Sequence, residues 1–279
     1  MRGTMKARRR KAGRGFVLIA VMWAGLALLI AVGAHLATTR GDAMTARAEQ
    51  ETARAVMLAR SGLNLALAAL AAGDAALPVP RDGTPWIIGM AEGEVVLRVE
   101  DEAGKIDVNH APVEILRPAL ARLGAQAGVD AFEASNLAQA IVARREAGGA
   151  IGSLEELAAA LDLDPAVAQA ATGMLTTLNL TPRIDPASAP AAVLASLPGV
   201  GEGEAEDIVA RRRAGGPVPR LGAAAVWLAP REGPTYRITA EATLSTGIRA
   251  RLSALVAARG IGFRGGRMEY EVLWVGGAR

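Results

Sequence analysis

Few side chains in this sequence are of the types that perform chemistry. The chain has no cysteine and only two histidines, His35 and His110. Without cysteine it can form no disulfide, no thiolate zinc site and no cysteine nucleophile. Neither histidine stands in a catalytic or metal-ligand motif, and no phosphate-binding loop, nucleophile elbow or EF-hand spacing is present. We therefore predict a protein with no catalytic residues, no metal and no cofactor, in which both histidines are structural.

Two acidic groups remain as candidates for a cation site. They are the run Glu100-Asp101-Glu102 and the pair Asp162 and Asp164. Carboxylate oxygens are ligands that calcium prefers, and weak calcium sites are common in extracellular modules. Solvated turns carry the same pattern more often, so we expect turns here and leave calcium binding open.

A glycine pattern near residue 200 points to a different chemistry. The segment Leu197–Gly201 reads LPGVG between two helical stretches, and its Pro198, Gly199 and Gly201 are typical of a helix-hairpin-helix motif. In many proteins the backbone N–H groups of such a hairpin hold a DNA phosphate. Four acidic residues follow directly: Glu202, Glu204, Glu206 and Asp207. Because they repel a phosphate backbone, we expect no nucleic-acid binding, and we expect Gly201 to adopt a conformation that is costly for other residues.

The helical middle of the chain contains an internal duplication. Elements of Ile106–Leu116 recur in Ile184–Leu194 at an offset of 78 residues, and elements of Ile141–Gly149 recur in Ile208–Gly216 at an offset of 67. The first copy has residues 123–128 where the hairpin should be, so the phosphate clamp is not duplicated. Each copy ends in arginines before a Gly-Gly pair: Arg144-Arg145 and Arg211-Arg212-Arg213. We expect these arginines to be solvated helix ends, where positive charge opposes the helix dipole.

Charge and hydropathy separate the N-terminus from the rest. Hydrophobic residues at 51% and charged residues at 21% exclude a disordered chain and a multi-span membrane protein, and aromatics at 3% exclude a stacking platform for single-stranded nucleic acid. Residues 1–15 hold seven basic residues and no acidic one. The next nineteen residues, 16–34, carry no charge, which is enough to cross a hydrocarbon core of ~30 Å. The basic residues place the N-terminus in the cytoplasm and the remainder across the membrane.

The remaining patterns predict an α+β fold. Residues 42–72 contain no proline and many strong helix formers, with one apolar stripe, so the first helix should continue to residue 72. Five strands are expected at 86–88, 94–99, 236–244, 248–256 and 268–275. The expected segments are a basic leader (1–15), a long helix (16–75), a small antiparallel sheet (76–106 and 230–279) and an inserted α-helical domain (107–229).

The N-terminus resembles that of type IV pilin-like proteins. A basic leader ends at Arg14-Gly15, and Phe16 opens the apolar segment. The resemblance implies that a prepilin peptidase cleaves between Gly15 and Phe16 and methylates the new N-terminus. Most members carry glutamate at the fifth mature position, where this sequence has Ala20.

Ala20 and the helical insertion together are similar to one branch of this family, the protein K minor pseudopilins of type II secretion systems. In the family the missing glutamate pairs with the N-terminus of a neighbouring subunit, so its absence suits a subunit at the filament tip. The resemblance implies a long helix on a pilin-like sheet, interrupted by a helix-hairpin-helix or SAM-like insertion. It also implies a non-enzymatic subunit of the bacterial inner membrane, with one span and a periplasmic C-terminal domain. Its implied partners are other minor pseudopilins, the major pseudopilin and the prepilin peptidase.

Two other interpretations stay open. A membrane-anchored DNA receptor of the competence type would also present a helix-hairpin-helix outside the membrane. A signal-anchored periplasmic enzyme is disfavoured because the sequence shows no catalytic constellation.

Overall fold

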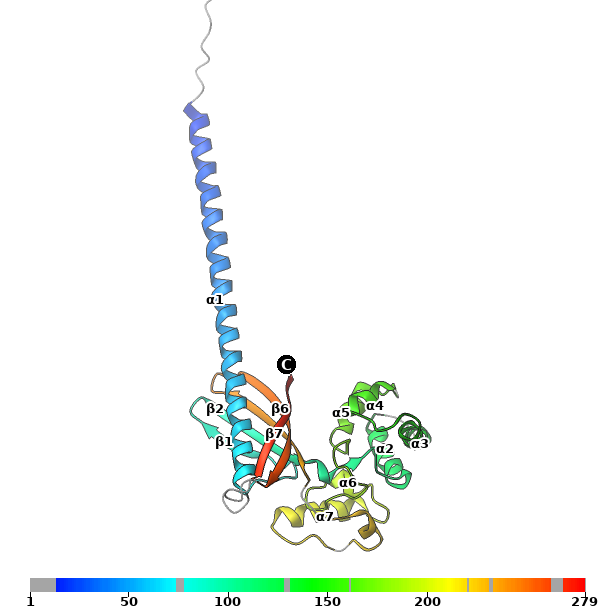
Figure 1. The fold of residues 1–279 in the computed structure, drawn as a ribbon. Coiled ribbons are helices and arrows are strands. Elements are labelled where there is room, and N and C mark those ends of the chain that lie inside the picture. Colours follow the sequence, from blue (N-terminus) through cyan, green and yellow to red (C-terminus); the bar gives the residue numbers. More distant parts are fainter. Residues whose placement is uncertain are drawn as a thin grey trace, which may run out of the picture. The chain divides into compact units, whose positions relative to one another are not determined.

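The computed structural model describes residues 14–73, 78–127, 131–160, 162–219, 221–230, 233–261 and 268–278 (Figure 1). Its helices are α1 (Arg14–Ala72), α2 (Val113–Ala127), α3 (Ala131–Gly148), α4 (Leu154–Ala160), α5 (Pro165–Ala171), α6 (Ala191–Leu194) and α7 (Glu202–Arg213), with short 3-10 helices η1 (Glu102–Gly104) and η2 (Gly222–Trp227). Its strands are β1 (Trp86–Met90), β2 (Gly93–Asp101), β3 (Ile106–Asp107), β4 (Leu175–Thr176), β5 (Thr235–Leu244), β6 (Arg249–Ile261) and β7 (Met268–Ala278). The predicted α+β class is confirmed, and most of the predicted leader, residues 1–13, lies outside the described residues.

The chain divides into two compact parts, residues 1–53 and residues 54–279. In the first part α1 carries the apolar segment Leu18–His35, which is exposed and long enough to cross a membrane. A second apolar stretch of α1, Met44–Ala72, passes the same length and hydropathy test. It is 44% buried, because its last four turns form part of a protein core. The predicted continuation of the helix to residue 72 is confirmed.

The second part contains a five-stranded antiparallel sheet in the order β1-β2-β5-β6-β7. All five predicted strands are present. Strands β2 and β5 are neighbours in the sheet, with Asp101 opposite Tyr236 and Gly93 opposite Leu244. The chain therefore leaves the sheet at the end of β2, forms helices α2 to α7, and returns beside the strand it left (Figure 1).

The sheet packs one face against α1. The helix contributes a stripe of small and aliphatic side chains, and the sheet contributes alternate residues of β2, β5 and β6. The buried helix residues are Ala55, Leu58, Ala59, Leu63, Ala66, Ala69 and Leu70. At Gly62 the helix backbone lies close against the side chain of Val95, because a Cβ atom there would lie 2.6 Å from Cγ1 of Val95. This spacing of three and four residues is the one that the sequence predicts for a helix with a single buried face.

The inserted helices have a hydrophobic core of their own. Their largest fully buried side chains are Ile106, Ile115, Leu116, Leu123, Ile141, Leu175, Ile184, Leu194 and Ile208. Several come from the duplicated positions, such as Ile106 with Ile184 and Ile141 with Ile208. The two copies also start in the same way, since Ile106 pairs in parallel with Leu175 and Ile184 with Leu228. The repeat in the sequence is thus a repeat in the structure.

Candidate functional site

The N-terminal site residues all lie on α1. Gly15 and Phe16 fall in its first turn, and Ala20 is exposed one turn further on. Cleavage after Gly15 and methylation of Phe16 stay predictions, because they concern a reaction of the unprocessed chain with another enzyme.

The hairpin joins α6 to α7, as the motif predicts. Pro198 and Gly199 are exposed at its tip, and Gly199 has a φ of +85°, a conformation that glycine adopts without strain. Gly201 instead has a φ of −83° and a ψ of 165°, which any residue adopts, and open space surrounds it. The expectation that Gly201 needs an unusual conformation is therefore wrong. The chain reverses its direction two residues earlier, at Gly199.

The hairpin is an unfavourable place for a phosphate. Helix α7 begins at Glu202, with Glu204 also in its first turn. The carboxylate of Glu202 accepts a hydrogen bond from Nη1 of Arg122 at 2.6 Å, while Nη2 of Arg122 donates to the carbonyl oxygen of Ala195 at 3.0 Å. The positive end of the helix dipole thus already faces carboxylates, and the nearby cation has protein partners.

One arginine in each repeat clamps the loop that opens that repeat. Arg145 Nη1 donates to the carbonyl oxygens of Val108 at 3.1 Å and Ala111 at 2.7 Å. In the second copy Arg212 Nη1 makes the equivalent bonds to Pro186 at 3.0 Å and Ala189 at 2.8 Å. The acceptors are related by the offset of 78 and the donors by the offset of 67. We call these four bonds the duplicated arginine clamp.

The clamp corrects the expectation of solvated arginines. The expectation holds for Arg144, whose side chain is 45% exposed and pairs with Glu156. It is wrong for Arg145 and Arg212. The side chain of Arg212 is 11% exposed, and its Nη2 also pairs with Asp82 at 2.9 Å. Burial opposes ionisation of Asp82, but hydrogen bonds from Thr84 and the charge of Arg212 outweigh it and lower the pKa of Asp82. The offset of 67 alone could not have revealed the clamp, because the exposed Arg144 and Arg211 share it.

A cluster of buried charges lies where the chain leaves the sheet. Lys105 is fully buried, and its Nζ contacts Oε2 of Glu100 at 2.7 Å and Oε1 of Glu102 at 3.2 Å. Glu102 is buried as well, and its Oε1 also accepts from Nε of Arg237 at 3.1 Å. Arg237 belongs to β5, the strand on which the chain returns. We call Glu100, Glu102, Lys105 and Arg237 the junction cluster.

Asp101 completes the junction with hydrogen bonds to the backbone. Its Oδ1 accepts from the N–H of Ala103 at 2.8 Å, and its Oδ2 accepts from the N–H of Gly233 at 2.9 Å. Burial raises the pKa of Asp101 to about 6, helped by the nearby charge of Asp185 and opposed by these hydrogen bonds. A Cβ atom at Gly233 would overlap Asp101, so only glycine allows the returning chain to come this close.

Most of the carboxylates considered for calcium have protein partners. Those of residues 100–102 face Lys105, Arg237 and backbone N–H groups, and Asp164 caps α5 by accepting from the N–H of Ala166 at 2.7 Å. Within the described ranges no three histidine, aspartate or glutamate side chains gather closely enough to hold a metal ion. A cavity of about 230 Å³ between α2 and α5 is lined by apolar side chains, with Asp162 and Asp164 as the only ionisable residues of its described lining.

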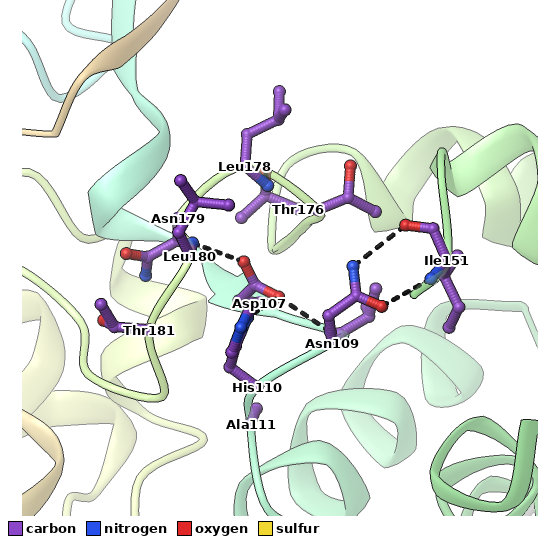
Figure 2. Close-up of polar contacts among 12 residues, drawn as sticks. Asp107, Asn109, His110, Ala111, Ile151, Thr176, Leu178, Asn179, Leu180 and Thr181 are labelled. Carbon is purple, nitrogen blue, oxygen red and sulfur yellow. Dashed lines mark hydrogen bonds and ion pairs between the residues drawn. The ribbon is translucent and has the colours of Figure 1, made fainter. Parts of the chain in front are cut away.

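A second polar network holds the loop after β4 (Figure 2). Buried Asn179 donates from Nδ2 to the carbonyl oxygens of Lys105 and Arg183, each at 2.9 Å. Asp107 accepts from the N–H of Asn109 at 2.8 Å, from the N–H of Leu180 at 2.7 Å, and contacts Nδ1 of His110 at 3.0 Å. His110 therefore helps to hold a turn, in line with the structural role predicted for it.

This network holds the backbone of Leu180 in a left-handed conformation. Leu180 has a φ of +61°, and its side chain is 60% exposed. A left-handed conformation costs a residue with a Cβ roughly 1–2 kcal/mol. Nothing in the sequence around Leu180 signals this conformation, because the bond that imposes it comes from Asp107, 73 residues away.

No protein-family model matches this sequence, and no curated protein matches it. Among solved structures, a chain of the GspK-GspI-GspJ complex from the enterotoxigenic Escherichia coli type 2 secretion system superposes on this chain with a TM-score of 0.55. The match covers 84% of this chain and 99% of that chain, at 15% sequence identity. The fold is pilin-like. At this identity the likeness concerns the fold alone.

We expect the stability of the junction to depend on pH through Asp101. Its folded pKa of about 6 lies above the ordinary 3.8, so the folded state holds this proton more tightly than the unfolded state. The contribution is present below about pH 4 and is lost as pH rises to about 6, by up to ~3 kcal/mol. Urea unfolding of the detergent-solubilised chain at several pH values, compared with Asp101→Asn, measures it. A difference between the two proteins that stays constant from pH 4 to 7 would contradict this assignment.

We expect Leu180→Gly to stabilise the protein by about 1 kcal/mol, because glycine adopts a positive φ without the cost of a Cβ. Leu180→Ala is the matched control, since it removes the same exposed side chain but keeps the strained backbone. Alanine should therefore leave the unfolding midpoint close to that of the parent. Equal effects of the two substitutions in urea unfolding would show that strain at residue 180 is not what is measured.

Proposed function

We propose that this chain is a minor pseudopilin of a type II secretion system, a non-enzymatic subunit that assembles with other pilin-like proteins. One observation carries the proposal: this chain, in which a large helical insertion enters a pilin-like sheet between adjacent strands, matches in fold 99% of a chain of the GspK-GspI-GspJ complex. That complex unites three different Gsp proteins. By analogy we propose other minor pseudopilins and the major pseudopilin as partners.

The pattern of α1 supports this function. Its N-terminal segment Leu18–His35 is apolar and exposed, as a membrane anchor or a filament core requires, whereas its last turns are committed to the sheet. The basic residues before the segment favour a cytoplasmic N-terminus. We therefore propose a single span in the inner membrane, with the sheet and the inserted helices in the periplasm and the leader removed by a prepilin peptidase.

Two features support a place at the tip of the filament. Ala20 supplies no carboxylate to pair with the N-terminus of a neighbouring subunit. The inserted helices form a body with a core of its own beside the sheet, which makes the head bulky to stack beneath another subunit. A tip subunit tolerates both features, since it must hold subunits on one side only.

The competing DNA receptor receives no such support. Two of the arginines that end the repeats, Arg145 and Arg212, donate to protein groups in the duplicated arginine clamp. The hairpin itself is followed by carboxylates at the start of α7. Both features reduce the electrostatic attraction on which non-specific DNA binding depends.

Processing of the N-terminus tests the proposed class. We expect mass spectrometry of the protein extracted from membranes to show residues 1–15 absent and Phe16 methylated. Gly15→Leu should leave the precursor uncut, because a side chain there obstructs the peptidase. An N-terminus beyond Ala34 would mean an ordinary signal peptide and would overturn the proposal.

The residue at the fifth mature position tests the place at the tip. We expect Ala20→Glu to bring no gain in assembly, because a tip subunit has no earlier neighbour whose N-terminus the carboxylate could pair with. The substitution places an unpaired carboxylate in an apolar setting at a cost of several kcal/mol. Secretion by cells that carry only this variant is the measurement. Normal secretion together with Ala20→Glu protein along the filament body would return the chain to the general pilin-like class.

A further inference from the structure

Helix α7 of the insertion contacts a segment that belongs to the sheet. Residues 81–83 run beside the end of β2, where Asp82 forms an antiparallel bridge with Glu100. On the other side of β2, Glu100 lies opposite Arg237 of β5. The segment therefore occupies the place of a third strand at the point where the chain leaves the sheet.

Three contacts join α7 to this segment. Oδ2 of Asp82 lies 2.9 Å from Nη2 of Arg212 and 3.5 Å from Nε of Arg213. Nε of Arg213 also donates to Oγ1 of Thr84 at 3.1 Å. Oδ1 of Asp82 accepts from the N–H of Thr84 at 3.0 Å, which orients the carboxylate towards the arginines. The side chain of Asp82 is 7% exposed, so salt screens its contact with Arg212 only weakly.

The equivalent end of α3, in the first copy of the repeat, carries different charges. At the offset of 67, Arg145 corresponds to Arg212 and Glu146 to Arg213. Arg145 uses Nη1 for its clamp, and among the described residues its Nη2 has no hydrogen-bond partner. Glu146 would repel a carboxylate placed as Asp82 is placed in the second copy. The charges at the two helix ends therefore determine which copy can attach to the sheet.

The other connections between the sheet and the insertion are narrow. The buried residues of the insertion and those of the sheet form two separate hydrophobic clusters. The chain leaves after β2 and returns at β5, and neighbouring strands are only ~5 Å apart. A cleft of about 470 Å³ lies between the outer strands of the sheet and residues 152–155 and 176–178 of the insertion. Domains that share a small interface move relative to each other unless a further contact holds them.

We propose that Asp82, Arg212 and Arg213 form a latch that fixes the inserted helices to the sheet through the second copy of the repeat. The two chain crossings occupy two adjacent strand positions, and Asp82 adds the third. The insertion is thus held over a wider base, which resists its twisting about the end of β2. The latch is a property of this chain and does not depend on the function proposed above.

Substitutions that exchange the charges of the two copies test the latch. Arg213→Glu gives the second copy the residue of the first, so that two carboxylates face each other at the latch. Asp82→Asn keeps the acceptor for the N–H of Thr84 but removes the acceptor for Arg212. Both substitutions should release the insertion. Glu146→Arg is the matched control, since it makes the reverse exchange at the exposed end of α3.

The measurement is the distance distribution between two spin labels in the detergent-solubilised chain. Because the chain has no cysteine, Ile87→Cys on β1 and Ala159→Cys on α4 provide two exposed and unique label sites. We expect one narrow distribution in the parent and in Glu146→Arg. In Asp82→Asn and Arg213→Glu the distribution should be about twofold broader or more.

Hydrogen exchange shows whether the two cores remain folded in these variants. The amides of α7 should exchange about tenfold faster in Asp82→Asn and Arg213→Glu, while those of β5 should stay protected. Arg213 is 54% exposed, so its substitution leaves both hydrophobic cores intact.

Three results would overturn the latch. The first is a broad distribution in the parent, and the second is an equally narrow distribution in all four proteins. The third is release by Glu146→Arg as well, which would show that the attachment is not specific to the second copy.

Discussion

The structure depends on how the chain leaves its sheet and returns to it. Strands β2 and β5 are adjacent, so about 130 residues of insertion begin and end within one strand spacing of each other. Asp101 closes this gap through the N–H of Gly233, and the junction cluster joins Glu102 at the start of the insertion to Arg237 on the returning strand. Taking Lys105 and Glu102 out of water is costly, so their pairing contributes little net stability. Arg237 reaches Glu102 from β5, so this contact depends on the register in which β5 pairs with β2. The pilin-like sheet and the inserted core can therefore have separate hydrophobic cores and still be fixed to each other at their common point.

Both copies of the duplication supply hydrogen-bond donors to backbone carbonyls in the turn that opens each copy. Each copy starts with a short parallel strand or bridge, turns at an aspartate that accepts from the backbone two residues on, and is clamped by an arginine from its last helix. Backbone carbonyls in such turns have no helix or sheet partner, and a buried carbonyl without a donor is costly. Arg145 and Arg212 supply the missing donors, two carbonyls to each guanidinium. In each copy this arginine thus supports the turn that opens the same copy.

Features that depend on local interactions could be predicted from the sequence, whereas features that depend on residues distant in sequence could not. The long helix, the five strands and the hairpin follow from local patterns: the spacing of apolar residues, alternation and glycine-rich turns. The errors concern long-range partners. The sequence predicts that Arg212 is a solvated helix end because its acceptors, at residues 186 and 189, are distant in sequence. It predicts that the acidic run at residues 100–102 is a solvated turn because the partner Arg237 lies on β5. The left-handed Leu180 is likewise imposed by a carboxylate 73 residues away. For Gly201 the error was local, since the hairpin reverses at Gly199 and needs no second special conformation.

Helix α1 combines an exposed apolar segment with a segment that buries one face. Its segment Leu18–His35 is apolar and exposed, which suits a bilayer or the packed helices of a filament. Its second half must bury only the stripe that faces the sheet, and that stripe consists largely of alanine and glycine. Small residues let the helix axis approach β2 so closely that Gly62 leaves no room for a Cβ beside Val95. A helix of larger side chains would stand further from the sheet and bury less of Val95, Leu97 and their neighbours. The small residues of this stripe are therefore a consequence of the close packing of α1 against β2.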